Sequence, residues 1–70
     1  MRHVSVSSSN LASVGYDGLT QTLEIAFLNG SLYSYAGVPA VVHQNLLNAS
    51  SHGSYFSANV RDKYPTRKLR

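Results

Sequence analysis

Cysteine is absent from this 70-residue chain, and acidic residues are scarce, with only three Asp and Glu in all. Without thiols, the chain can form neither disulfide bonds nor a thiolate metal site. No apolar run approaches the roughly 18 residues of a membrane span, and the first residues lack the apolar stretch of a signal peptide. We therefore expect a cytoplasmic protein that does not contact a membrane.

The titratable side chains do not form a pattern that indicates catalysis. Asp17 falls in an expected turn, Glu24 on the outward face of an expected strand and Asp62 among basic neighbours, so we interpret each as a solvated surface residue. No serine stands in a G-x-S-x-G motif or with a histidine and an acid in a recognisable arrangement. The three histidines are too scattered for a metal site, and the glycines lack nucleotide-binding spacings. We expect no enzymatic activity, no cofactor and no metal.

A length of 70 residues allows one domain with a small hydrophobic core. Such a core stabilises a protein by only about 3–5 kcal/mol. The apolar fraction of 43% is nevertheless too high for a disordered chain. We expect a single domain over residues 1–70, of marginal stability or stabilised by association into a homo-oligomer.

Three segments carry strand patterns. Leu11 to Tyr16 is a candidate strand, and Thr22 to Phe27 alternates polar or small with apolar residues at period two. A third strand ends at Val38-Pro39, because proline restricts the residue before it. The serine-rich residues 4–10 form either a leader or a short edge segment.

Asn29-Gly30 predicts a hairpin, for which two registers are open. A two-residue loop would place Tyr33 and Tyr35 on an exposed sheet face, where they could stack on bases. A three-residue loop with a left-handed Gly30 sets Ile25 opposite Tyr33 and Leu23 opposite Tyr35. We favour the second register because it gathers five large side chains on one buried face.

Two helices are expected after the third strand. The first begins at Pro39, ends near Ser50 and carries an apolar stripe of Val42, Leu46 and Ala49. The second, which ends at Pro65, carries an apolar row at a spacing of four, namely Phe56, Val60 and Tyr64. The expected fold is therefore α+β, a three-stranded antiparallel meander covered on one face by two C-terminal helices.

The net charge of +3 is concentrated in the last ten residues. Residues 1–60 hold one arginine and two acids, whereas residues 61–70 hold five basic residues and one acid. Such a cluster can attract a phosphate-bearing partner, but it is also a common way to keep a small protein soluble. Both interpretations remain open for this segment.

Two features favour an anionic ligand. The segment 51–54 precedes a helix whose first amides lack intrahelical partners, so a phosphate could bind there, although simple helix capping is the alternative. Aromatic rings among basic residues are typical of single-stranded nucleic-acid binding, although Tyr64 could equally belong to the core. The candidate binding residues are Tyr33, Tyr35, Ser51, His52, Gly53, Ser54, Arg61, Lys63, Tyr64, Arg67 and Lys68.

Short motifs follow one another in a characteristic order along nearly the whole chain. They are Val6-Ser7-Ser8-Ser9, Gly15-Tyr16-Asp17, Leu23-x-Ile25-x-Phe27-x-Asn29-Gly30, Tyr33-x-Tyr35, Val38-Pro39, Ala49-x-Ser51-x-Gly53-x-Tyr55-Phe56 and Arg61-x-Lys63-Tyr64. In this order they resemble the KTSC domain family, small proteins similar to a C-terminal extension of some lysyl-tRNA synthetases. That resemblance implies an RNA-binding role and adds Tyr16 and Phe56 to the residues of interest.

The leading hypothesis is a non-catalytic module that binds tRNA or single-stranded RNA through a basic C-terminal helix and tail. One alternative is a small oligomeric protein that binds or sequesters a nucleotide-like anionic ligand. Another is a protein-protein interaction module that docks a partner on an exposed strand edge or on its tyrosines.

Overall fold

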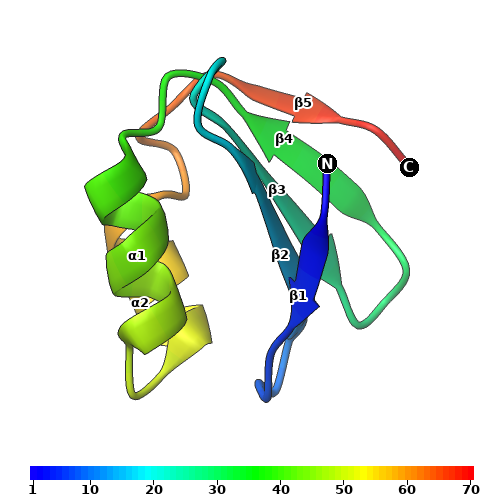
Figure 1. Ribbon diagram of the computed structural model, residues 1–70. Coiled ribbons are helices and arrows are strands. Elements are labelled where there is room, and N and C mark those ends of the chain that lie inside the picture. The colour runs from blue at the N-terminus through cyan, green and yellow to red at the C-terminus, as the bar shows by residue number, and fades with distance from the viewer.

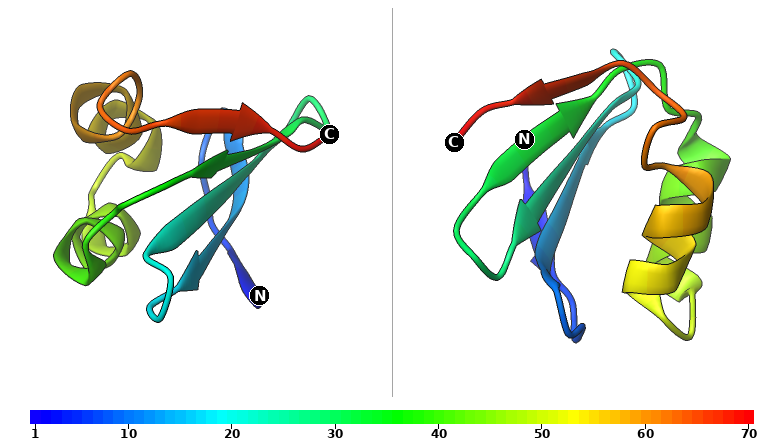
Figure 2. Two further views of the ribbon diagram at one scale, coloured as in Figure 1. Left: turned by 90° about the horizontal axis from the view of Figure 1, so that it is seen from above. Right: turned by 180° about the vertical axis from the view of Figure 1, so that it is seen from behind.

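The computed structural model describes residues 1–70 as one antiparallel sheet with two helices on one of its faces (Figure 1). The elements, in chain order, are β1 (His3–Ser5), β2 (Leu11–Asp17), β3 (Thr22–Phe27), β4 (Leu32–Tyr35), α1 (Ala40–Asn48), α2 (His52–Asn59) and β5 (Thr66–Lys68). The five strands lie in the sheet in the same order as in the chain. Figure 2 shows the two helices side by side over the same face of the sheet. Neither helix has the length and apolar character needed to cross a membrane.

The β3–β4 hairpin adopts the register that gathers large side chains on one face. Ile25 pairs with Tyr33 and Leu23 pairs with Tyr35, as predicted. Gly30 has a φ of 92°, and its N–H donates to the carbonyl of Phe27 at 3.0 Å. Because only glycine adopts such a φ readily, Gly30 fixes the loop length and with it the register.

The core lies between this face of the sheet and the two helices. Nine hydrophobic residues are buried there, namely Leu11, Val14, Leu23, Ile25, Tyr35, Val38, Leu46, Phe56 and Val60. Phe56 of α2 links the helices to the sheet, because its ring packs edge to face against Phe27 and Tyr35. The ring centroids are 5.6 Å apart in both pairs. The α+β fold and the coverage of one sheet face by two helices are thereby confirmed.

The expected number of strands was wrong, since the sheet has five and not three. The first additional strand is β1, in which Val4 pairs with Val14 of β2. The second is β5, in which Arg67 pairs with Ser34 of β4, so part of the supposed basic tail is an edge strand. These three-residue strands carry no alternating pattern of their own, because they form by pairing with a neighbouring strand edge.

The second helix is shorter than expected. It ends at Asn59, and the N–H groups of Val60 and Arg61 both donate to the carbonyl of Phe56 at 2.9 Å. Asp62 then takes a φ of 61°, which turns the chain away from the helix axis. The predicted basic helix was therefore wrong, because Arg61 and Lys63 belong to a turn. An apolar spacing of four predicted the helix, but it does not show where the backbone turns.

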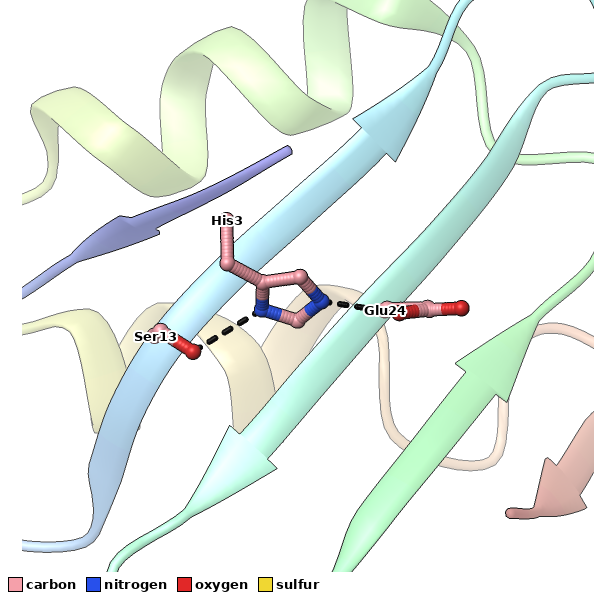
Figure 3. Close-up of polar contacts among 3 residues, drawn as sticks. All are labelled: His3, Ser13 and Glu24. Atoms are coloured by element: carbon pink, nitrogen blue, oxygen red, sulfur yellow. Dashed lines mark hydrogen bonds and ion pairs between the residues drawn. The ribbon is translucent and has the colours of Figure 1, made fainter. Parts of the chain in front are cut away.

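His3 bridges three strands on the face of the sheet opposite the helices (Figure 3). Its Nδ1 lies 2.8 Å from the Ser13 hydroxyl, and its Nε2 lies 2.8 Å from a carboxylate oxygen of Glu24. Glu24 was expected to be a solvated surface residue on the outward face, and it does lie on that face, but its side chain is only 20% exposed and is paired with His3. Antiparallel pairing of β1, β2 and β3 brings these residues together, which no sequence spacing reveals.

Gly15 allows the His3 ring to lie close against β2. A Cβ atom at position 15 would lie 2.6 Å from Cδ2 of His3. We therefore predict that Gly15→Ala lowers the free energy of unfolding by about 1–3 kcal/mol, because the ring must move and β1 with it. In a His3→Ala background the same change is expected to have a clearly smaller effect. Urea unfolding of the four proteins measures this coupling.

Gly18→Ala is the matched control, because a Cβ at that position would meet only Tyr16 at 3.7 Å. It is expected to change stability little in either background. Equal losses for Gly15→Ala with and without His3 would contradict the proposed role of the His3 ring.

His43 of α1 stacks on Tyr16 of β2, with ring centroids 4.5 Å apart and planes 11° from parallel. Burial lowers the pKa of His43 below its ordinary value of 6.5. The unfolded chain therefore takes up this proton at a higher pH than the folded protein. We predict that the free energy of unfolding decreases as the pH falls through about 6.5, and that His43→Phe weakens this dependence while keeping a stacked ring. Urea unfolding midpoints of the wild type and of His43→Phe, measured between pH 7.5 and pH 5, test this prediction. The same dependence of the midpoint on pH in both proteins would contradict it.

Candidate nucleic-acid interface

A groove lies between α2, with the turn that follows it, and the β3–β4 hairpin. It has a volume of about 390 Å³, and its apolar walls are Phe27, Tyr33, Tyr35 and Phe56. Phe27 and Tyr33 are only half-buried, and their rings pack edge to face with centroids 5.7 Å apart. We call this feature the aromatic groove. It gathers three of the four aromatic contacts of the protein and leaves ring surface of Phe27 and Tyr33 exposed.

Charged residues stand at one side of the aromatic groove. Arg61 and Asp62, from the turn after α2, line it together with Thr66 of β5. Lys68, two residues further along β5, holds its Nζ 6.0 Å from the centroid of the Tyr33 ring. The side chains of Lys68 and Tyr33 share a sheet face because their positions are paired. Cations and aromatic faces are thus presented together.

Tyr35 provides a polar atom inside the aromatic groove. Tyr35 is only 4% exposed, and its hydroxyl makes no hydrogen bond to another group of the protein. Every fully buried side-chain polar atom of the protein has a hydrogen-bond partner, so this unpaired hydroxyl is not fully buried. The hydroxyl therefore retains some solvent exposure, and Tyr35 is one of the residues that line the groove. Burial raises the pKa of Tyr35 to about 12, with smaller contributions from Tyr33 and Asp62, while Arg61 acts in the opposite direction. The hydroxyl stays protonated at neutral pH and can donate to a ligand.

A second, polar hollow lies beside the first at the start of α2. Its lining includes Ser51, Gly53 and Ser54, as well as Asn10 and Ser57, which also line the aromatic groove. Ser51 caps α2, because its hydroxyl accepts the N–H of Ser54 at 3.3 Å. Helix capping, the alternative to phosphate binding at this segment, is therefore observed. It occupies the N–H of Ser54, one of the amides that a bound phosphate would need.

The remaining predicted binding residues lie elsewhere. His52 joins the helices, because its Nδ1 lies 2.8 Å from the carbonyl oxygen of Leu46 and donates to it. Lys63 is exposed in the turn after α2 and lines neither hollow. Tyr64 is half-buried and packs against the core, which was the alternative kept for it. Arg67 points to the opposite face of β5 from Lys68, since side chains alternate along a strand.

Of the predicted binding residues, the structure brings Tyr33, Tyr35 and Arg61 into the aromatic groove, with Lys68 next to it. The sequence interpretation missed Phe27, Asn10 and Asn29, and it described Asp62 only as a solvated acid. The Phe27-x-Asn29 motif was the one available signal, and it was read as a hairpin. Nothing in the local sequence indicates that residues 10 and 62 line the same groove.

Comparison with known proteins agrees with this description of the fold. Residues 7–64 match the KTSC domain. The chain belongs to the KTSC domain family. The crystal structure of a KTSC domain protein from Yersinia pestis superposes with a TM-score of 0.93 at 40% identity, covering 99% of this chain and 97% of that chain. A protein of Stutzerimonas stutzeri is 47% identical over 57 residues, which cover 81% of this chain and 80% of that protein.

KTSC sequence also occurs in larger relatives. A lysine–tRNA ligase of Trichormus variabilis is 41% identical over 54 residues, which cover 77% of this chain but 10% of the ligase. A lysine–tRNA ligase of Nostoc punctiforme is 38% identical over 61 residues, which cover 87% of this chain and 11% of that enzyme. The resemblance found from the sequence motifs is therefore confirmed, and the chain spans about a tenth of each ligase.

Proposed function

We propose that this KTSC protein binds RNA through the aromatic groove, as a non-catalytic module that holds an unpaired segment of tRNA or of another single-stranded RNA. The observation that carries the proposal is the combination of half-buried aromatic rings with basic side chains at one groove. Phe27 and Tyr33 offer ring surface, and Arg61 and Lys68 stand beside it. Single-stranded nucleic acid is held by stacking on such rings and by cations along its backbone.

The relation to lysine–tRNA ligases supports RNA as the ligand. Those relatives are named for an enzyme that acts with tRNA, and a segment of each is similar to most of this chain. A module that is found both alone and joined to such a ligase is consistent with a role in holding RNA. The charge distribution agrees, because the basic residues are concentrated in the segment that forms one side of the groove.

A nucleotide-like small ligand is the second candidate, and the size of the aromatic groove favours it. A volume of about 390 Å³ lies at the lower end of the roughly 300–1,000 Å³ typical of small-molecule sites. The groove therefore has room for about one nucleoside unit, either free or as part of a strand. Native mass spectrometry of the purified protein distinguishes the two, since a sequestered nucleotide would remain bound and RNA binding requires no such ligand.

Binding to RNA is predicted to depend on the face of β5 from which a charge is removed. Lys68→Ala should weaken binding to a fluorescently labelled single-stranded RNA several-fold, because Lys68 lies beside Tyr33. Arg67→Ala removes the same charge from the opposite face of the strand and should have a smaller effect. Affinity should also fall with salt, with a log–log slope of roughly −0.7 for each phosphate contacted. Fluorescence polarisation across a salt series measures these effects, with labelled tRNA as a second ligand.

Tyr33→Leu tests stacking separately from charge. A stacked base contributes about 1–3 kcal/mol, so this change should weaken binding roughly 5- to 150-fold. Tyr64→Leu is the matched control, because Tyr64 is half-buried against the core but does not line the groove. Equal losses for the two tyrosines, or an affinity that does not change with salt, would refute binding at this groove. Truncation before Thr66 is not a suitable control, because it would remove β5 from the sheet.

A further inference from the structure

Asp62 is the one feature of the aromatic groove that binding to a polyanion does not explain. It lines the groove beside Arg61, and its backbone holds a φ of 61°. Asp62 and Tyr35 line the same groove, and the charge of Asp62 contributes to the raised pKa of the Tyr35 hydroxyl. A carboxylate at this position repels phosphate. It is favourable only toward a ligand that presents hydrogen-bond donors.

The four RNA bases differ in the donors that they can present to a carboxylate. The Watson–Crick edge of guanine carries two adjacent donors, N1–H and the N2 amino group, which match the two oxygens of a carboxylate. Adenine and cytosine place an acceptor next to their amino group, and uracil places its one N–H between two acceptors. Unpaired bases in RNA are recognised on this edge. A lone carboxylate therefore favours guanine among the four.

The groove also provides donors for the remaining atom of that edge, O6 of guanine. The Tyr35 hydroxyl is protonated and makes no hydrogen bond within the protein, and Tyr35 lines the groove. Arg61 lines the same side with a guanidinium that can only donate. Tyr33 and Phe27 supply ring surface on which a purine can stack. Acceptor, donor and stacking surface thus occur together in a space of about one nucleoside.

We infer that the aromatic groove selects an unpaired guanine, with the Asp62 carboxylate accepting from N1 and N2 and with donors of Tyr35 and Arg61 directed at O6. This inference rests on the proposed RNA-binding function and adds base selectivity to it. It also gives Asp62 a specific role, because its carboxylate excludes bases that cannot donate two adjacent hydrogen bonds.

The test uses labelled pentanucleotides that differ only in the central base, UUGUU, UUAUU, UUCUU and UUUUU, measured by fluorescence polarisation at low salt. The wild-type protein is expected to bind UUGUU about tenfold more tightly than the others, as for a good bidentate contact to a base. Asp62→Asn should reduce this preference to about twofold, mainly through weaker binding of UUGUU. Asparagine also tolerates a left-handed backbone, so the turn is retained. A central inosine, which lacks the N2 amino group, should bind wild type with intermediate affinity.

Asp17→Asn is the matched control, since it removes the same charge from the end of β2, away from the groove, and should leave the preference for UUGUU intact. If Asp62→Asn tightens binding of all four oligonucleotides equally, or leaves the preference unchanged, the inference is overturned while RNA binding stands. If wild type binds the four equally, selectivity is likewise refuted. If it binds none of them, the proposed function itself fails.

Discussion

The pairing of β3 with β4 decides the face of the sheet on which each tyrosine of β4 lies. Gly30, at a φ of 92°, closes a loop that sets Ile25 opposite Tyr33. A shift by one residue would turn both tyrosines to the face that carries His3 and Glu24, because side chains alternate along a strand. The helices would then lose Tyr35 from their contact with the sheet, and the groove would lose its central wall. Core and candidate site therefore depend on the same backbone geometry.

Helix α2 and the turn that follows it also contribute to the aromatic groove. The helix ends at Asn59, and the Phe56 ring within it contacts Phe27 and Tyr35. Phe27 and Tyr33 remain half-buried. The chain then returns through a tight turn and adds β5 to the edge of β4. Arg61 and Asp62 of that turn line the groove together with the aromatic residues.

The polar side chains on the two faces of the sheet differ in whether they have hydrogen-bond partners within the protein. On the outer face, His3 satisfies Ser13 and Glu24 within the protein, and Gly15 gives the ring the space to do so. On the helix side, the Tyr35 hydroxyl is left without a protein partner beside a charged rim. Polar groups that are already paired hold a fold together, whereas an accessible unpaired group next to apolar walls is available to a ligand. This difference is why we place function at the groove.

The sequence by itself determined the elements whose signals are local. Alternation predicted the strand that includes Leu23 and Ile25, and Pro39 with the apolar stripe after it predicted α1. Asn29-Gly30 predicted a hairpin with two open registers, and the gathering of large side chains on one face favoured the correct one. The order of motifs also identified the family. Only the tertiary structure decided that β1 and β5 are strands, that His3 meets Glu24 and that Asp62 faces the aromatic groove. These features arise from pairing and packing between segments far apart in the chain, whose free energy depends on a partner surface that no local pattern contains.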